Sequence, residues 1–426
     1  MIIHVINRGD SIYSIARRYA VPVDTVLDAN QIPNPDRLVI GQAIVVPGDF
    51  FQHTVRSGES MYTIARDYGV PLSLLLDANP QISNPSRLQV GQRVIVPRAP
   101  RKMGNIFVNG FVFPNVDGSV LRSSLPHLTY LSIFSYMVMS DGSLSGINDA
   151  GVIQSARGAN VAPLMVITNL EEDAGFSSEL AHTILTDLQL QNTLIENILA
   201  TMRERNYYGL VVDFEYLYPD DRQNFNNFVS RIVNALRPLG YEVMVALAPK
   251  TSGTQQGLLY EAHDYPAIGA LADKVILMTY EWGYTYGPAM AVAPVNEVRR
   301  VLDYATSVMP SEKILMGMPN YGYDWTLPFT RGSAARVVTN NGAILLASRV
   351  GATISFDNTS QAPFFNYYDS TGRRHEVWFD DPRSISARLA LVAEYDLGGV
   401  SYWTLNSFYA PNWVVLDSMY NVRKVI

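Results

Sequence analysis

Cysteine is absent from the 426 residues, and histidine occurs only six times. The absence of cysteine excludes disulfide bridges, thiolate metal sites and cysteine nucleophiles. The histidines, at positions 4, 53, 127, 182, 263 and 375, are scattered and include no pair spaced as two ligands on one helix face. We therefore expect neither a metal site nor another cofactor.

Long apolar runs and an excess of positive charge are also missing. No run approaches the roughly 18 residues of a membrane-spanning helix, so we expect no membrane span. Acidic residues (39) outnumber basic ones (32), which gives a net charge of −7 and argues against a nucleic-acid partner. The first ten residues lack the features of a secretory signal. Either a signal has been removed, or the protein reaches its destination another way.

The composition is that of a folded protein with more than one domain. Hydrophobic residues make up 48% and charged residues 17% of the sequence, which argues against disorder. A chain of 426 residues exceeds the usual size of a single core. We therefore expect at least two domains.

The first hundred residues contain an internal repeat. Residues 4–30 match residues 53–79, and after one inserted residue, Pro80, residues 32–47 match residues 82–97. Two copies favour tandem domains over a solenoid. In the first copy, Ile12, Ile15, Ala16 and Tyr19 fall on one face of a helix. With a strand at 4–6, a second helix at 23–29 and a closing strand that ends at 47, each copy is predicted to be a βααβ unit.

Both copies resemble the LysM family through the elements G-D/E-S-x-x-x-I-A, D-A-N, N-P-x-x-L-x-x-G-Q and V-P. The resemblance places LysM domains at 1–48 and 50–98, and it implies binding of peptidoglycan, chitin or another N-acetylglucosamine-containing glycan. The groove residues it implies are Asp10, Ser11, Ile12, Asn34 and Pro35 in the first copy and Glu59, Ser60, Met61, Ile82 and Asn84 in the second. The serines could instead only cap helices, and the Asn-Pro pairs could only turn the chain.

A short linker at 99–104 is followed by a large domain at 105–426. Eight apolar, β-rich runs alternate there with helical patterns, at 105–113, 130–138, 162–170, 208–216, 242–250, 274–282, 313–323 and 398–405. This alternation predicts an α/β fold, a (β/α)8 TIM barrel, whose active site lies at the carboxyl ends of its strands. The stretch 325–380 departs from the pattern and is interpreted as a small β-hairpin insertion, either a wall of the cleft or a structural flap.

The fourth run ends in two carboxylates, Asp213 and Glu215. Side chains alternate along a strand, so Val211, Asp213 and Glu215 point one way and Val212 and Phe214 the other. If the latter two pack against helices, both carboxylates enter the barrel mouth. Two negative charges at such a short separation raise the apparent pKa of one of the two carboxyl groups. That group can therefore keep its proton near neutral pH.

The same stretch resembles the strand signature D-G-x-D-x-D-x-E of glycoside hydrolase family 18. Gly209, Asp213 and Glu215 match it, whereas Tyr208 and Val211 replace the two earlier aspartates. The missing carboxylate at position 211 puts the family's usual proton relay in doubt. The eight runs, the Met-x-Tyr of residues 278–280 and the tryptophan at 403 extend the resemblance over the large domain.

The resemblance implies substrate-assisted hydrolysis with retention of configuration. Glu215 would protonate the glycosidic oxygen, and the substrate's 2-acetamido oxygen would act as the nucleophile. Asp213 would hold the acetamido N–H, Tyr280 would contact the acetamido oxygen, and Trp403 would form the floor of the sugar site. Tyr280 and Trp403 could also be core residues. Further candidates for contacts with sugar hydroxyl groups are Glu281, Asn169, Asn320 and Tyr321.

The domain order resembles that of the spore-associated N-acetylglucosaminidases of bacilli, which implies cortex peptidoglycan fragments as substrate, a role in germination and deposition in the spore. A chitinase or an endo-β-N-acetylglucosaminidase uses the same Asp-x-Glu and remains open as an alternative. A non-catalytic wall-binding lectin is a third reading, against which the presence of Glu215 argues.

Overall fold

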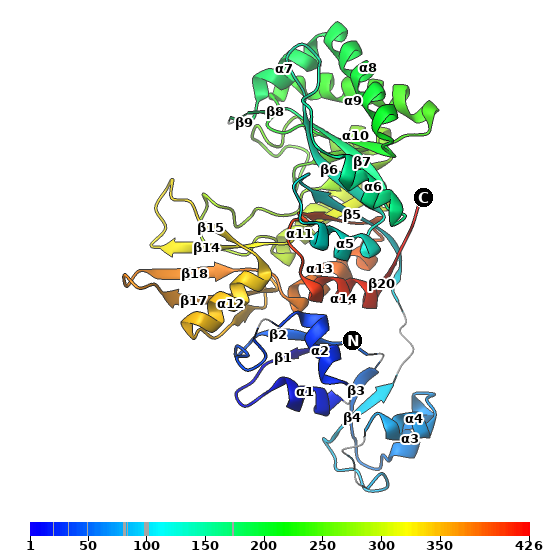
Figure 1. Ribbon diagram of the computed structural model, residues 1–426, viewed down its shortest axis with the longest axis vertical. Helices are drawn as coiled ribbons and strands as arrows, with labels where there is room; N and C mark the ends of the chain where they lie inside the picture. Colours follow the sequence, from blue (N-terminus) through cyan, green and yellow to red (C-terminus); the bar gives the residue numbers. More distant parts are fainter. Residues whose placement is uncertain are drawn as a thin grey trace.

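The computed structural model describes residues 1–19, 21–32, 34–48, 50–79, 82, 84–97, 102–172 and 174–426. Figure 1 shows two small N-terminal modules below a barrel, with a separate antiparallel sheet at the side of the barrel. Residues 99–101 of the predicted linker lie outside the described residues.

Each N-terminal module is a βααβ unit, as predicted. The first consists of β1 (Ile2–Val5), α1 (Ile12–Tyr19), α2 (Val23–Asn30) and β2 (Ala43–Val46), with β1 and β2 antiparallel. The second consists of β3 (Phe50–Thr54), α3 (Met61–Asp67), α4 (Leu72–Asp77) and β4 (Arg93–Pro97). The predicted apolar face of α1 is buried in the core of its module.

Eight parallel strands form a closed barrel in the large domain. They are β5 (Gly104–Val112), β6 (Tyr130–Met137), β7 (Ala162–Thr168), β10 (Gly209–Asp213), β11 (Glu242–Leu247), β12 (Lys274–Leu277), β13 (Ile314–Pro319) and β19 (Gly399–Trp403). In this order each strand pairs with the one that follows it, and β19 pairs with β5 to close the ring. Seven of the eight strands fall within the predicted runs, and β5 begins one residue before its run, at Gly104. A short strand, β20 (Tyr420–Val422), adds to the start of β5.

Helices surround the barrel. They are α5 (Gly118–Ser124), α6 (Ala150–Gly158), α7 (Ser178–Thr186), α8 (Leu188–Arg205), α9 (Arg222–Leu236), α10 (Tyr265–Leu271), α11 (Val295–Val308), α13 (Pro382–Glu394) and α14 (Ala410–Met419). A small hairpin, β8 (Leu170–Glu171) and β9 (Gly175–Phe176), follows β7. Within the described chain, no helix has the length and apolarity needed to cross a membrane.

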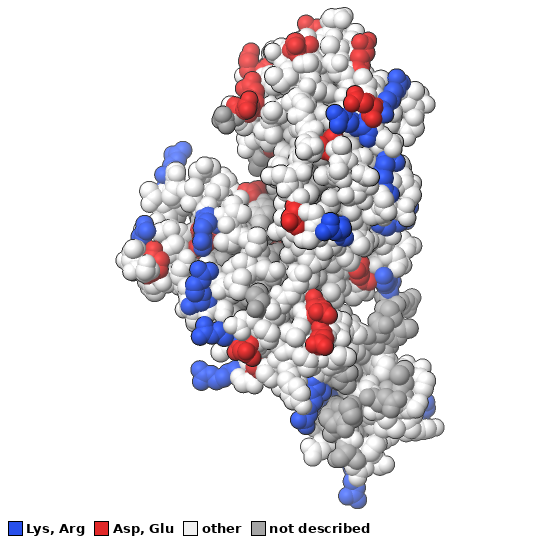
Figure 2. Space-filling model, viewed as in Figure 1, with Lys and Arg blue, Asp and Glu red and all other residues white. Residues whose placement is uncertain are grey.

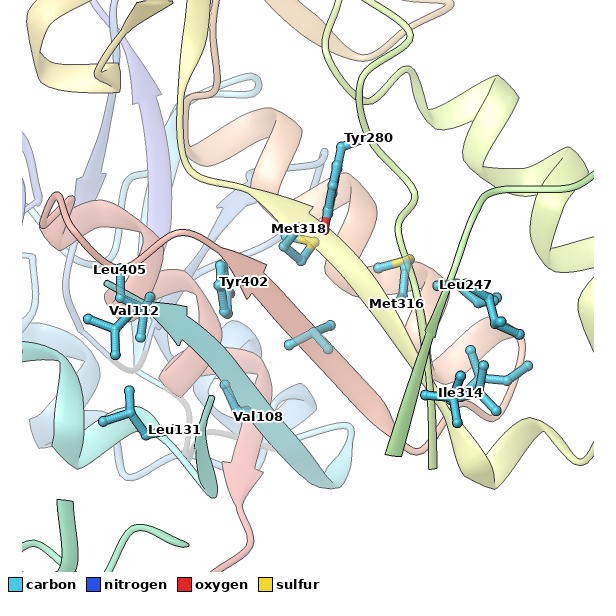
Figure 3. Packing of buried hydrophobic residues seen from close by; sticks show 14 of the residues in the cluster. Val108, Val112, Leu131, Leu247, Tyr280, Ile314, Met316, Met318, Tyr402 and Leu405 are labelled. Carbon is cyan, nitrogen blue, oxygen red and sulfur yellow. The ribbon is translucent and has the colours of Figure 1, made fainter. Parts of the chain in front are cut away.

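The two faces of the barrel strands belong to separate hydrophobic clusters. Val212 and Phe214 pack outward, in a cluster that Figure 3 shows in part, while Val211 belongs to the cluster inside the barrel. The ring of Phe214 lies 6.4 Å from that of Phe225 and 5.7 Å from that of Phe228, both on α9. Because side chains alternate along the strand, this anchoring turns Asp213 and Glu215 inward, as predicted.

The insertion is larger than the predicted small hairpin. It is a five-stranded antiparallel sheet of β14 (Gly322–Leu327), β15 (Arg336–Val338), β16 (Ser355–Asp357), β17 (Ala362–Tyr368) and β18 (Arg374–Trp378), with α12 (Asn340–Val350). Its β17–β18 hairpin is the part that was predicted, from strand-like, aromatic-rich residues on either side of an Asp-Ser-Thr-Gly turn. There Asp369 accepts hydrogen bonds from the backbone N–H groups of Thr371 at 2.8 Å and Arg373 at 3.0 Å.

The first module is docked on the large domain. The N–H of Ile354 donates to the carbonyl of Ile40 at 2.9 Å, and Arg383 donates to the carbonyl of Gly41 at 3.1 Å. Gly41 has φ +83°, and a Cβ there would lie 1.9 Å from the carbonyl oxygen of Ile354. Glycine is therefore required for this close approach.

Candidate active site

A cavity of about 470 Å³ opens at the carboxyl ends of the barrel strands. Five of the eight predicted active-site residues line it, namely Asp213, Glu215, Tyr280, Glu281 and Trp403. Its other lining residues are mostly aromatic or apolar, so the carboxylates lie in surroundings of low polarity. The structure places Asp213 and Glu215 together in the barrel mouth, as the sequence predicted.

Asp213 is almost completely buried at the end of β10. Only 4% of its surface is exposed, and within the described chain its Oδ1 atom has no hydrogen-bond partner. Burial raises the pKa of Asp213 to about 7. Ionised Asp213 thus lacks the donors that would stabilise its charge, and it is poised to accept a hydrogen bond from a ligand.

Glu215 is the carboxyl group best suited to hold a proton. Burial, and then the negative charges of Asp213 and Glu281, raise its pKa well above the ordinary value. Three carboxyl groups therefore share one cavity of low polarity, and their titration is a property of the group. A protonated Glu215 at neutral pH can serve as a general acid.

Glu281 is held by two tyrosines of the insertion side. The hydroxyl group of Tyr321 donates to its Oε1 atom, and that of Tyr323 lies 3.1 Å from Oε1 and 3.2 Å from Oε2. Burial raises the pKa of Glu281, and these two hydrogen bonds oppose the rise. Tyr321 is not among the residues that line the cavity, and its hydroxyl group orients the carboxyl group of Glu281, which does line it.

Aromatic residues shape the cavity around the carboxylates. The ring of Trp403 meets those of Phe134 at 4.9 Å and Phe111 at 5.4 Å, edge to face, which fixes the plane of the indole. Tyr280 is 9% exposed, and burial together with the charges of Asp213, Glu215 and Glu281 raises its pKa. Tyr216 and Tyr284, which the sequence analysis did not single out, also line the cavity and are 44% and 42% exposed.

The backbone around the two carboxylates is held by buried polar side chains. Asn169 accepts a hydrogen bond from the N–H of Glu215 and donates one to its carbonyl, both at 2.9 Å. His263 accepts from the N–H of Ala248 through Nδ1, so its Nε2–H donates to the carbonyl of Phe214 at 3.0 Å. Burial lowers the pKa of His263 to about 4, which keeps the ring neutral.

These contacts change two of the predicted roles. Asn169 is fully buried and does not line the cavity, so its amide holds the chain at Glu215 and does not reach a sugar. Asn320 is 8% exposed and donates to the carbonyls of Thr404 and Ser407, which supports the loop after Trp403. No sequence pattern marked His263 or Tyr323. In the described part of the chain, no cluster of three or more His, Asp and Glu side chains could hold a metal ion.

In the LysM modules, two predicted groove residues are buried, and a third, Asp10, is held in a hydrogen-bond network. Ile12 and Met61 are 4% and 1% exposed and belong to the module cores, because they begin the apolar face of their helices. Asp10 receives hydrogen bonds from the N–H of Asn7 at 2.9 Å and from Arg18 at 3.2 Å, and its Oδ2 lies 3.1 Å from His4 Nε2.

The same network recurs in the second module. Glu59 lies 2.6 Å from both His53 Nε2 and the N–H of Arg56, so Asp10 and Glu59 stabilise their loops.

The other predicted groove residues lie at or near the surface. Ser60 forms a capping box with Thr63, and the side chain of Ser11 accepts from the N–H of Ser14 at 3.1 Å. Asn34 and Asn84 each accept from the N–H two residues later, at 3.1 and 3.2 Å. Pro35 is exposed and Ile82 is half-buried. Capping and turning are thus observed, and these roles leave the exposed atoms available to a glycan.

Comparison with known proteins gives the same two families as the sequence motifs. Residues 126–407 match glycosyl hydrolases family 18, and residues 4–47 and 53–97 match the LysM domain. The cortical fragment-lytic enzyme of Bacillus subtilis (strain 168) is 47% identical over 433 residues, covering 100% of this chain and 99% of that protein. That of Bacillus anthracis is 40% identical over 424 residues, 98% of each chain.

A solved structure gives the same result. The spore cortex-lytic enzyme SleL of Bacillus megaterium QM B1551 is similar with a TM-score of 0.93 and 38% identity, over 100% of this chain and 99% of that one. The predicted TIM barrel, the LysM modules and the predicted glycosidase activity are confirmed. The chain belongs to glycosyl hydrolases family 18 and carries two LysM domains ahead of its catalytic barrel.

Proposed function

We propose that this glycosidase cleaves β-linked N-acetylglucosamine in fragments of spore cortex peptidoglycan. The observation that carries the chemistry is the burial of Glu215 beside Asp213 in the barrel mouth, which raises the pKa of Glu215 and keeps a proton available. The substrate is supported by the relatives that match the whole chain and are named as cortical fragment-lytic enzymes.

Glu215 acts as the general acid on the glycosidic oxygen in this proposal. The acetamido oxygen of the substrate attacks the anomeric carbon as the protonated glycosidic bond breaks, which forms an oxazolinium ion. Water then attacks the same carbon and opens this ion, so two inversions retain the configuration without a protein nucleophile. The free Oδ1 of Asp213 accepts the acetamido N–H and stabilises the positive charge that develops beside it. Tyr280 contacts the acetamido oxygen, and Trp403 stacks on the sugar ring.

The LysM modules hold the enzyme on its polymer. Two weak sites on one chain raise the local concentration of the catalytic domain, provided that both reach the same glycan. The relatives' names point to the spore as the place of action. The first module is docked on the large domain, so bound glycan is held at a fixed side of the barrel.

Digestion of purified cortex fragments tests the substrate. We expect mass spectrometry to show new reducing ends at N-acetylglucosamine and a faster turnover of these fragments than of chitin oligosaccharides of equal length. New reducing ends at the muramic sugar would contradict the proposal. A preference for chitin oligosaccharides would favour a chitinase, and binding without turnover of either polymer would favour a lectin.

A further inference from the structure

The two LysM modules are packed against each other. Ile95, on β4 of the second module, is 2% exposed and belongs to the hydrophobic core of the first module. The ring of Phe50 stacks on that of Tyr19 at 6.4 Å and 12° between planes. The β-sheet of the second module therefore covers α1 of the first, and the junction has a defined shape.

A cleft of about 500 Å³ lies at this junction. One wall comes from α1, with Tyr13, Arg17 and Arg18, and the other from the second sheet, with Gln52, Arg93 and the apolar Ile95 at the base. Tyr13 is 67% exposed, so its ring is available to a ligand. Basic side chains are visible where α1 meets the second module in Figure 2.

The three arginines bring more positive charge to the cleft than the surrounding residues neutralise. Arg18 donates to Asp10 at 3.2 Å, but Asp10 also binds His4 and the backbone of Asn7. Across the described ranges, neither Arg17 nor Arg93 forms an ion pair with an acidic group. Burial is the main cause of the lowered pKa of His4, and the charges of Arg18 and Arg93 lower it further, so both guanidinium groups lie near that ring. Several guanidinium groups that line one cleft together favour an anion between them.

The repeat provides an internal comparison. The position of Arg18 is occupied by Asp67 in the second copy, and that of Arg93 by Ala43 in the first. In the second module Arg66, the counterpart of Arg17, pairs with Asp67 at 2.8 Å. The unpaired positive charge is thus absent from the equivalent surfaces, and it is not required by the LysM fold itself.

We propose that the cleft between the LysM modules binds carboxylate groups of the wall glycan. This proposal rests on the proposed function, because peptidoglycan, unlike chitin, supplies carboxylates along a chain of N-acetylated sugars. Guanidinium groups bind carboxylates through paired N–H donors, and the ring of Tyr13 offers a face for a neighbouring sugar. None of the residues implied as the LysM groove lines the cleft, although Ser14, which does, hydrogen-bonds to Ser11 at 3.1 Å. The cleft therefore adds recognition of charge next to the implied site for N-acetylglucosamine.

Binding to insoluble polymers tests the proposal without turnover. The Arg17→Gln/Arg93→Gln double variant is compared with Arg66→Gln, which alters the equivalent exposed arginine outside the cleft. Both are prepared with Glu215→Gln to prevent digestion, and their unfolding temperatures are measured. We expect the double variant to bind peptidoglycan roughly tenfold more weakly at low salt, the order of one lost charge-assisted contact, and to bind chitin normally. Arg66→Gln should bind both polymers normally.

Treated polymers identify the source of the carboxylates. Amidase treatment removes the peptide carboxylates and frees the lactyl carboxylates. A difference between the double variant and its parent that disappears after this treatment assigns the peptide carboxylates, and one that persists shows that the cleft accepts a lactyl carboxylate. Equal binding of the double variant and its parent to peptidoglycan overturns the proposal. The proposal is also overturned if the double variant loses as much binding to chitin, or to peptidoglycan with amidated carboxylates, as it loses to untreated peptidoglycan. It is likewise overturned if Arg66→Gln loses as much binding to peptidoglycan as the double variant does. Turnover of soluble fragments is measured separately with proteins that retain Glu215. Failure of the proposed function is therefore distinguished from failure of the proposed carboxylate binding.

Discussion

Asn169 holds Glu215 by the backbone, with its amide oxygen accepting from the Glu215 N–H and its amide nitrogen donating to the Glu215 carbonyl, each at 2.9 Å. Two hydrogen bonds to one residue fix the orientation of its peptide groups and so the direction of its side chain. The donor and acceptor come from the end of β7, next to β10 in the barrel. A neighbouring strand thus sets the position of the proposed acid.

Replacement of Asn169 by alanine is expected to lower kcat by about 10- to 100-fold, because small misplacements of a reacting group carry costs of this order. KM should change little, since Asn169 does not line the cavity. Steady-state kinetics on soluble cortex fragments measure both constants. Gln191→Ala provides the control, because Gln191 is also a buried amide that donates to main-chain carbonyls, but it does so on the helices α7 and α8. An equal loss of kcat in both variants would show a general effect of destabilisation.

Replacement of Glu215 by glutamine keeps the size of the side chain but removes the acid. We expect turnover to fall by about 10²- to 10⁴-fold, which is the usual contribution of general acid catalysis, and binding of the polymer to remain. Product release is followed by mass spectrometry and binding by sedimentation with peptidoglycan. Turnover near the wild-type rate in this variant would show that another group donates the proton.

The periodicity of the sequence was sufficient to predict the fold and the orientation of the carboxylates. Val212 and Phe214 pack on the outer helices and Val211 lies inside, as the alternation along 208–216 indicates. The five-stranded insertion was underestimated, because β15 and β16 have only three residues each and show no measurable period. The repeat itself marked Ile12 as a core residue, and that signal outweighs the groove role implied by resemblance.

The polar contacts of the site could not be predicted in the same way. Asn169 and Glu215 are 46 residues apart, and His263 lies 49 residues from Phe214. Pairing across such separations depends on how the barrel brings strand ends together and not on any local pattern. A buried asparagine at the end of a strand is equally consistent with a ligand contact and with a backbone clamp, and only the structure distinguishes them.

Replacement of Asp213 by asparagine is expected to stabilise the fold in a pH-dependent manner. Burial raises the pKa of Asp213 from 3.8 to about 7, so the folded protein binds this proton more tightly than the unfolded chain. The resulting stability is present at low pH and is lost as the pH rises from about 4 to 7. The variant does not suffer this loss, so its advantage should grow to ~1–3 kcal/mol at pH 7.5, since one pKa unit corresponds to about 1.4 kcal/mol.

Thermal unfolding at pH 4.5 and 7.5 measures this advantage. Asp36→Asn, at an exposed position of the first module, is the control for charge removal alone. A difference between Asp213→Asn and the wild type that is the same at both pH values would contradict the raised pKa. Activity should be lost in the Asp213 variant, which would show that the buried charge is retained for catalysis at a cost in stability.

Val211, the residue that departs from the family signature, allows the charge of Asp213 to be tuned in either direction. It is fully buried in the barrel interior, on the same face as Asp213 and two residues before it. Asparagine at position 211 can donate to the unpartnered Oδ1 of Asp213 without adding charge, which should lower the pKa of Asp213. Aspartate adds a like charge and should raise the pKa that the pair shares.

The pH profile of kcat therefore distinguishes Val211→Asn from Val211→Asp. We expect the limb of the kcat–pH profile that depends on Asp213 to move to lower pH in Val211→Asn and to higher pH in Val211→Asp. Each variant should lose about 1–3 kcal/mol of stability, because a polar group replaces a buried isopropyl group. Val211→Ala, which loses packing but gains no polar atom, should leave the limb in place. Movement of all three profiles in one direction would mean that packing at position 211, and not hydrogen bonding or charge, controls the titration of Asp213.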